Sequence, residues 1–295
     1  MSYRIIIVLF FFTELLFAQQ PDSTFIDSLN KLRGIIYSAT NDSIKLQYNE
    51  AYFQSLYGKL SEKGSYKYSF EQLTDIGIKE SSDKAFTLYN WNVVLANGTN
   101  KYFAIMHLNS KSKKNSKEEL VVLQDATEAD NSTCYKVLDH RKWIGALYYE
   151  IIPVKRRRKV YYVLLGWDGN NRITNKKIIE TLTIQGNSIR FGVDVFKNST
   201  ERMKKRVVFE YAEDVVMSLK YHADQRAIVF DHLSPSSPNL EGVYEYYGPD
   251  FTYNSYQYEK GKWVLKEDIQ INGKESNKVY SPKSTEKEKK IYSPK

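Results

Sequence analysis

The chain has 295 residues, 42% of them hydrophobic, and a formal net charge of +8. Most of this charge lies in Lys155–Lys159 and in the segment 274–295, so the remaining chain is nearly neutral and lacks the broad basic surface that steers long anionic polymers. Cys134 is the single cysteine, which excludes a disulfide within the chain. Stability must therefore come from burial, for which 24 Tyr and four Trp supply much of the material.

Residues 1–18 have the pattern of a secretory signal peptide. A short positive segment ends at Arg4, an apolar segment extends from Ile5 to Phe17, and Ala18 supplies the small residue before the expected cleavage point. The apolar segment is shorter than the about 20 residues of a membrane-spanning helix, and Glu14 leaves an uncleaved anchor as the alternative. We expect an exported protein, periplasmic or associated with the outer envelope. After cleavage it is not an integral membrane protein, and export disfavours nucleic acid as a partner.

Residues 19–64 are expected to form a helical segment with two apolar faces separated by the turn-forming Thr40–Ser43. The residues that recur at helical spacing are Phe25, Leu29, Leu32 and Ile36, and then Ile44, Tyr48, Tyr52, Leu56 and Leu60. This pattern predicts an antiparallel helical hairpin packed on the rest of the molecule. An amphipathic arm that docks onto a partner is the alternative.

Residues 65–273 are expected to form a β-rich domain, because apolar residues alternate with polar ones and hairpin turns such as Asn97–Gly98 separate the runs. The later strands are expected at Trp143–Val154, Val160–Leu165, Ile189–Phe196, Arg206–Tyr211, Val215–Tyr221, Ala227–Asp231, Val243–Tyr247, Phe251–Tyr258 and Lys262–Asp268. A turn is expected at Gly248–Asp250. We predict a mainly β fold, an antiparallel sandwich, barrel or curved meander.

The segment 274–295 is polar and rich in Lys and Glu, which is typical of a basic, disordered tail. It contains two similar pentapeptides, Val279–Lys283 and Ile291–Lys295, which both end in Tyr-Ser-Pro-Lys. They are either a docking motif or a chance duplication.

A polar turn follows the apolar run Val160–Leu165, at the end of an expected buried strand, where folds often place functional groups. Its candidate functional residues are Trp167, Asp168, Asn170 and Asn171. The alternative is a structural Asx-type turn, with Asp168 accepting backbone N–H groups and Trp167 largely buried. Gly166 and Gly169 would then serve a positive φ or a close approach. The next segment, Asn175–Thr181, is compatible with a short helix.

The basic pentad is the second candidate site. Lys155, Arg156, Arg157, Arg158 and Lys159 form the expected tip of a hairpin, where they could bind an anion such as a phosphate of an envelope lipid or an acidic polymer. The alternative is a solvated tip that discourages pairing with other sheet edges.

Strong catalytic and cofactor motifs are absent from the sequence. There is no GxSxG, HExxH, CxxC or GxGxxG motif and no phosphate loop. His222 and His232 lie too far apart on the expected hairpin to share a zinc ion, so we expect no metal and no cofactor. Cys134 and His140 could form a nucleophile and base, although a lone Cys in a polar loop is more often a tolerated thiol.

Three runs carry a resemblance to a family: GWDGNNRITNKKIIETL, KRVVFEYAEDVVMSLKY and IVFDHLSPSSPNLEGVYEYYGPDFTYNSY, followed by KGKWV. Together they resemble an uncharacterised exported-protein family of the Bacteroidetes, over roughly Trp143 to Asp268. The resemblance implies export and a single β-rich domain, and it implies no catalytic residue.

These features predict a non-catalytic binding or assembly module of the cell envelope, with an envelope protein or an anionic polymer or lipid as its partner. The alternative is a hydrolase with a carboxylate-based site around Asp168, with Asp231 or His232 as the second group. A second titratable group within about 3 to 9 Å of Asp168 in a concave pocket favours the hydrolase. An Asp168 that is engaged in capping favours the binding module.

Overall fold

The computed structural model describes residues 21–73, 75–109, 119–186, 188–199, 202–271 and 279–280. The expected signal peptide and nearly all of the tail 274–295 lie outside the described residues. No helix in these ranges is long and apolar enough to cross a membrane.

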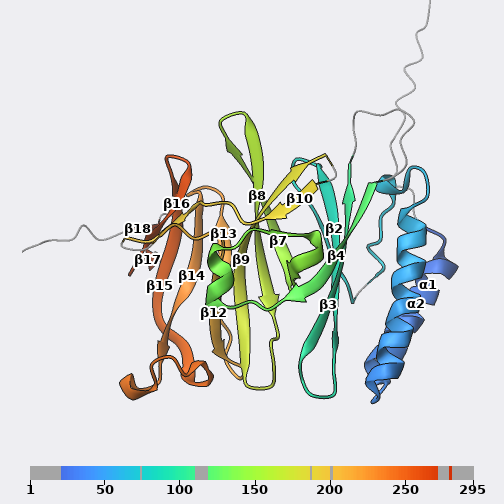
Figure 1. Cartoon of the computed structure of the whole chain (residues 1–295), viewed down its shortest axis with the longest axis horizontal. Coiled ribbons are helices and arrows are strands. Elements are labelled where there is room, and N and C mark those ends of the chain that lie inside the picture. The colour runs from blue at the N-terminus through green and yellow to red at the C-terminus, as the bar shows by residue number, and fades with distance from the viewer. Residues whose placement is uncertain are drawn as a thin grey trace, which may run out of the picture.

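Two helices open the described chain, α1 (Ser23–Ser38) and α2 (Asp42–Leu60). Each begins at a side chain that accepts backbone N–H groups: Asp22 Oδ1 accepts from Thr24 N at 3.2 Å, and Asn41 Oδ1 accepts from Ser43 N at 2.8 Å. The helices lie side by side on one flank of the molecule (Figure 1). The predicted helical hairpin is therefore confirmed.

The rest of the fold is built from three main sheets, whose strands are named in their spatial order. The first contains β1 (Gly77–Glu80), β2 (Phe86–Val94), β3 (Asn100–Leu108), β4 (Glu119–Thr127) and β6 (Trp143–Ile144). The second contains β5 (Leu138–Asp139), β10 (Ser188–Phe191), β9 (Thr174–Gln185), β8 (Lys159–Asp168) and β7 (Leu147–Arg156), with β12 (Val207–Ala212) paired to β9. The third contains β11 (Phe196–Lys197), β16 (Lys262–Lys266), β15 (Tyr247–Glu259), β14 (Ala227–Pro235) and β13 (Leu219–His222). A small pair is formed by β17 (Gln270–Ile271) and β18 (Val279–Tyr280).

The helices and the three sheets stack as four layers (Figure 1). One core joins the helices to the first sheet, where Leu56 and Tyr52 pack with Trp91. A second core, with Met106 and Leu164, fills the space between the first and second sheets. A third core, which includes Val163, Phe230 and Trp263, lies between the second and third sheets. The predicted mainly β, antiparallel fold is confirmed, in the form of stacked sheets.

The second sheet is the central layer, with side chains buried on both of its faces. Along β8, Tyr162 and Leu164 face the first sheet, whereas Val163 and Leu165 face the third. This explains why the run Val160–Leu165 is continuously apolar, since alternation disappears when both faces of a strand are covered.

The expected short helix at Asn175–Thr181 is wrong, because this segment belongs to β9. Its backbone pairs on one side with β8, as in Leu164↔Glu180, and on the other with β12, as in Val207↔Ile179. Two polar residues of this segment are buried and paired with distant residues: Lys176 with Glu210 of β12, and Glu180 with Arg206, which precedes β12. Tertiary pairing thus overrides a weak local preference.

The third sheet also departs from expectation. The strand expected at Val215–Tyr221 is shorter, since β13 begins at Leu219. The turn expected at Gly248–Asp250 does not form, because β15 runs continuously from Tyr247 to Glu259 and a bulge opposite β14 absorbs the irregularity. The expected β13–β14 hairpin forms, with His222 opposite Ala227.

Candidate functional site

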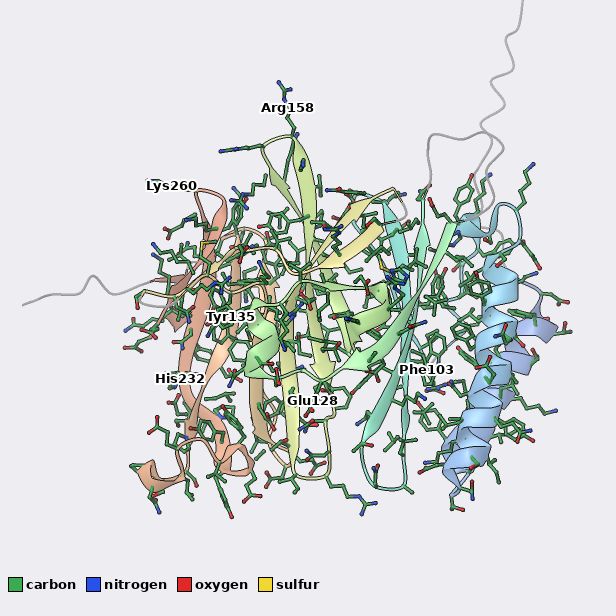
Figure 2. All side chains as sticks on the ribbon, viewed as in Figure 1. Phe103, Glu128, Tyr135, Arg158, His232 and Lys260 are labelled. Atoms are coloured by element: carbon green, nitrogen blue, oxygen red, sulfur yellow. The ribbon has the colours of Figure 1, made fainter. Side chains whose placement is uncertain are left out.

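A polar pocket that includes part of the predicted turn lies between the first and second sheets, at the end of the sandwich where β8 finishes. Its volume is about 340 Å³. The lining comes from four separate parts of the chain: Thr99, Asn100, Tyr102, Asp125, Ala126, Thr127, Glu128, Ala129, Gly145, Asp168 and Asn170. Glu128 lies at this lower end of the molecule (Figure 2). We call this the Asp125–Asp168 pocket.

Asp168 is the last residue of β8, and its side chain is only 8% exposed. Its Oδ1 accepts a hydrogen bond from the Tyr102 hydroxyl at 2.8 Å and another from Asn170 N at 2.7 Å. The second bond makes the Asx-type turn that the sequence predicts. The hydrogen bond from the Tyr102 hydroxyl links the two inner sheets, because Tyr102 belongs to β3 of the first sheet and Asp168 to β8 of the second. The Tyr102 hydroxyl in turn accepts from Gly169 N at 2.8 Å.

Asp125 enters the same pocket from β4. Its Oδ2 accepts from Tyr102 N at 2.9 Å, and Gly145 N–H also donates to this carboxylate. Gly145 is needed for this approach, since a Cβ at that position would lie 2.6 Å from Asp125 Oδ1. Tyr102 therefore orients both carboxylates: its backbone N–H binds Asp125, and its hydroxyl binds Asp168.

A second polar network adjoins the pocket on the central sheet. The Asn170 amide donates to Thr174 Oγ1 at 2.6 Å, and that hydroxyl donates to Glu210 Oε1 at 2.7 Å. Lys176, which is only 3% exposed, places its Nζ 3.9 Å from Glu210 Oε2. This pairing explains how a Lys is tolerated within the sandwich, because an unpaired buried charge would be strongly unfavourable.

Burial controls the protonation of the pocket. Loss of solvent raises the pKa of Asp168 above its usual range, although Asn170 N–H, the Tyr102 hydroxyl and Lys176 oppose the rise. Loss of solvent also raises the pKa of Asp125, and the negative charge of Asp168 adds to that rise. The same causes raise the pKa of the Tyr102 hydroxyl, so it remains a hydrogen-bond donor at neutral pH.

The candidate turn is divided between the two faces of the central sheet. Asp168 and Asn170 line the pocket, whereas Trp167 is hydrogen-bonded to Tyr211, which belongs to the core between the second and third sheets. Asn171 is a structural cap, because its Oδ1 accepts from Ile173 N at 2.8 Å and from Thr174 N at 3.0 Å. Trp167 is of intermediate exposure, so most but not all of its surface is buried, in keeping with the expectation for this residue.

Gly166 and Gly169 are needed because neighbouring side chains pack closely against their Cα atoms, and not because the backbone is left-handed there. Neither has a positive φ. A Cβ on Gly166 would lie 2.8 Å from the Tyr148 ring, and one on Gly169 would lie 2.6 Å from Asn100 Nδ2. The residue with a positive φ is Asn170, at 36°.

The basic pentad lies at the other end of β8. Lys155 and Arg156 end β7, Arg157 and Arg158 make the turn, and Lys159 begins β8. All five side chains are exposed, and Arg158 projects beyond the rest of the molecule (Figure 2). The structure thus separates the pentad from the Asp125–Asp168 pocket by the length of the strand.

The other candidate groups do not reach the pocket. Asp231 and His232 lie on β14 in the third sheet, where Asp231 Oδ2 accepts from Ser218 N at 2.6 Å and His232 Nδ1 lies 2.7 Å from Asp250 Oδ2. Cys134 is buried, and burial raises the pKa of its thiol, which disfavours the nucleophilic thiolate.

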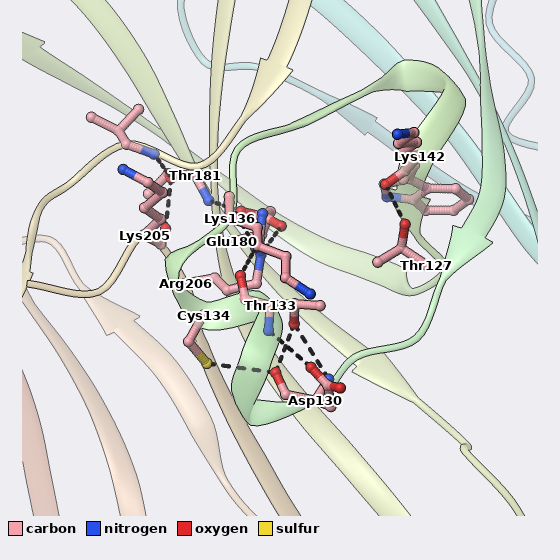
Figure 3. A network of polar contacts seen from close by, with 12 residues as sticks. Thr127, Asp130, Thr133, Cys134, Lys136, Lys142, Glu180, Thr181, Lys205 and Arg206 are labelled. Carbon is pink, nitrogen blue, oxygen red and sulfur yellow. Dashed lines mark hydrogen bonds and ion pairs between the residues drawn. The ribbon is translucent and has the colours of Figure 1, made fainter.

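A buried ion pair holds one wall of the pocket in place. Arg206 Nε donates to Glu180 Oε2 at 2.7 Å, and both side chains are fully buried (Figure 3). Arg206 also donates to the carbonyl groups of Thr133 and Lys136. The segment that carries Ala129 is thereby tied to the central sheet.

The sequence pattern did not single out Tyr102 or Asp125. The one local signal for Asp125 is a carboxylate that follows the apolar run Leu120–Leu123 of β4, where only distant parts of the chain give it partners. A larger groove of about 580 Å³ beside β1 includes carboxylates, but these, Glu71 and Glu80, are exposed.

The described residues contain no cluster of three or more His, Cys, Asp or Glu side chains that could hold a metal ion. Comparison with protein-family models, with curated proteins and with solved structures found no match. Function is therefore inferred from the pocket and the surface of this chain alone.

Proposed function

We propose that this chain is an exported protein of the cell envelope that binds a ligand in the Asp125–Asp168 pocket without transforming it. The ligand presents hydroxyl or amino groups, as a sugar or a polyamine does. Support comes from the chemistry of the lining, which offers the carboxylates Asp125, Glu128 and Asp168 and the carboxamides Asn100 and Asn170. Among the described residues, the lining includes no Lys, Arg or His, so it favours neutral or positively charged hydrogen-bond donors.

The observation that carries this proposal is the fixed orientation of the two carboxylates. Asp168 accepts from the Tyr102 hydroxyl and Asn170 N through Oδ1 alone, and within the described residues no hydrogen bond reaches its Oδ2. Asp125 is likewise held by backbone N–H groups. Such preorganised acceptors suit binding, because little ordering remains when the ligand arrives.

A carboxylate-based hydrolase is the second candidate. The observation in its favour is that Asp125 and Asp168 share one pocket, where burial raises the pKa of both carboxyl groups and the charge of Asp168 adds to the rise at Asp125. A raised pKa is what a general acid requires at neutral pH. The bonds that engage Asp168 Oδ1 favour the binding function over this one.

Calorimetry with the mature chain separates the two functions. Wild-type protein is titrated with neutral mono- and disaccharides and with spermidine, in parallel with Asp125→Asn and Asp168→Asn. The matched control is Asp214→Asn, which removes an exposed carboxylate outside the pocket. We expect one ligand class to bind the wild type and the control equally, and to bind each pocket variant at least about tenfold more weakly.

A hydrolase would instead release product. If chromogenic glycosides or esters are cleaved by the wild type and the Asp214→Asn control but not by Asp125→Asn, the non-catalytic proposal is wrong. Pull-downs from an envelope extract are then run in parallel with tagged wild type and tagged Asp125→Asn. A component that only the wild type retains is the molecule that carries the ligand.

A further inference from the structure

Four hairpin turns gather at the end of the sandwich opposite the pocket. The turn after β1 reaches β8, because the Tyr162 hydroxyl donates to Asp83 Oδ2 at 3.0 Å. The tips of β7–β8 and β15–β16 adjoin, since a Cβ on Gly261 would lie 3.5 Å from Arg156 Nε. The β13–β14 turn lies beside β15, where Tyr258 N donates to the Arg226 carbonyl at 3.0 Å.

Each of these turns has a cation at a left-handed backbone position. The φ angles are 56° at Lys84, 55° at Arg157, 51° at Arg226 and 47° at Lys260. Left-handed positions favour Gly, which has no Cβ to clash with the backbone, or Asn, whose short polar side chain can hydrogen-bond locally. Exposed cations thus occupy the positions of four adjacent turns where backbone conformation alone would favour other residues.

The charge of this end is largely uncompensated. The pentad Lys155–Lys159 is exposed throughout, and none of its side chains forms an ion pair with a carboxylate of the described chain. The acidic residues of the same turns are Asp83, Asp224 and Glu259. Of these, Asp83 accepts from Tyr162, and Glu259 Oε1 is already 2.9 Å from Lys266 Nζ.

The shape of this end selects the partner. Arg158 and Lys260 stand at the tips of hairpins that project in the same direction (Figure 2). A projecting set of tips can touch a broad surface at several points, whereas a polymer chain is normally held in a groove. Val160, beside the pentad, is 41% exposed and offers an apolar contact at the same tip. Clusters of basic side chains of this kind are attracted to bilayers with anionic lipids.

We propose that this basic end, formed by Lys84, Lys155–Lys159, Arg226 and Lys260, docks the protein onto the phosphate-bearing surface of an anionic lipid bilayer. The Asp125–Asp168 pocket then opens away from the bilayer. Docking does not depend on what the pocket binds, so it goes beyond the proposed function.

Vesicle binding of the full mature chain tests this proposal. Sedimentation is measured with vesicles of phosphatidylcholine alone and with equal parts of phosphatidylcholine and phosphatidylglycerol, at low and high salt. The test variant is Arg157→Gln with Arg158→Gln. The matched control is Lys31→Gln with Lys63→Gln, which removes two exposed cations from the helical layer.

We expect binding to the anionic vesicles only, weakened by salt, with about a 30-fold loss of affinity in the tip variant. The helical-layer control should bind within about twofold of the wild type, and both variants should melt as the wild type does. Equal loss in both variants, or equal binding to phosphatidylcholine, overturns the proposal. So does binding to a soluble acidic polysaccharide without binding to vesicles.

Discussion

Asp168 connects the two inner layers through a single oxygen atom. Its Oδ1 accepts from a side chain of the first sheet, Tyr102, and from the backbone of its own turn at Asn170. Because the carboxylate is buried, a substitution that removes the acceptor leaves the Tyr102 hydroxyl without its partner. The residue is thus structural and pocket-lining at once, and substitution can separate these roles.

We predict that Asp168→Ala lowers the free energy of unfolding by about 2 kcal/mol, since hydrogen bonds to a charged group are lost. Asp168→Asn keeps the shape and one acceptor, so it should cost less than about 1 kcal/mol. Urea unfolding measures both values. An Asp168→Asn protein with an unchanged midpoint that no longer binds its ligand would show that the charge serves function rather than folding.

Asp125 should make stability depend on pH. Burial raises its pKa above the ordinary value of 3.8, so the folded chain holds the proton more tightly than the unfolded chain. The stabilising contribution of the protonated side chain is present below the unfolded pKa and is lost as the pH rises through the folded pKa. Asp168, whose pKa is also raised, acts in the same direction.

Asp125→Asn removes one of the two titrating groups. The substitution also removes a hydrogen-bond acceptor, which changes the free energy of unfolding by an amount that does not vary with pH. We predict that the stability of the variant relative to the wild type increases as the pH rises through the folded pKa of Asp125. Urea midpoints of both proteins at a series of pH values check this prediction. A difference that moves in favour of the wild type with rising pH would contradict the assigned direction.

At the scale of elements, the β13–β14 hairpin shows how register decides which residues form the core. Leu219 pairs with Phe230, and both pack between the second and third sheets. Val229, the neighbour of Phe230, faces the other side of the third sheet and packs with Ile269. All three residues are buried, although they belong to two clusters.

We predict that Leu219→Ala lowers the free energy of unfolding by about 2 to 5 kcal/mol, because its side chain is fully enclosed. Val216, three residues earlier, is 86% exposed, so Val216→Ala is the matched control and should change stability by less than about 0.5 kcal/mol. Thermal and denaturant midpoints measure both. Equal midpoints for the two variants would be incompatible with this register.

The β7–β8 turn gives a prediction of opposite sign. Arg157 holds a φ of 55°, where Gly lacks the steric repulsion of a Cβ. Arg157→Gly should therefore raise the free energy of unfolding by about 1 kcal/mol, as measured by calorimetry. Arg158→Gly is the comparison, since Arg158 has no positive φ, and it should be neutral or destabilising. A lower melting temperature for Arg157→Gly would indicate that the Arg side chain stabilises the turn.

For the whole molecule, the helical layer covers an apolar face that would otherwise be open to water. Trp91 and Ile105 of the first sheet are buried beneath it, and Trp91 Nε1 donates to Asn49 of α2 at 2.8 Å. The layer is thus part of the core of the fold, rather than an arm held out for a partner.

We predict that a chain beginning at residue 65 associates or precipitates, because the exposed sheet face is large and apolar. A chain beginning at residue 19 retains both helices and is the matched control. Size-exclusion chromatography with light scattering compares them. A monodisperse monomer from the shorter chain would show that the first sheet is stable without its helical cover.

The sequence by itself determined the classes of element and most of their positions. Apolar spacing predicted the two helices, because a helix buries every third or fourth residue. Turn-forming residues marked most hairpins, since tight turns demand particular backbone conformations. The Asx-type turn at Asp168 was predictable for the same reason: its partner Asn170 is two residues away.

Only the tertiary structure decided which residues share a pocket. Tyr102 and Asp125 meet Asp168 because strands far apart in the chain pair and stack, and no local pattern encodes that proximity. Stacking also reversed the expectation for Asn175–Thr181: burial on both faces removes alternation, and polar residues such as Glu180 are accommodated by distant partners. The basic end likewise exists only once four hairpins, each with a cation at a left-handed position of its turn, are brought side by side.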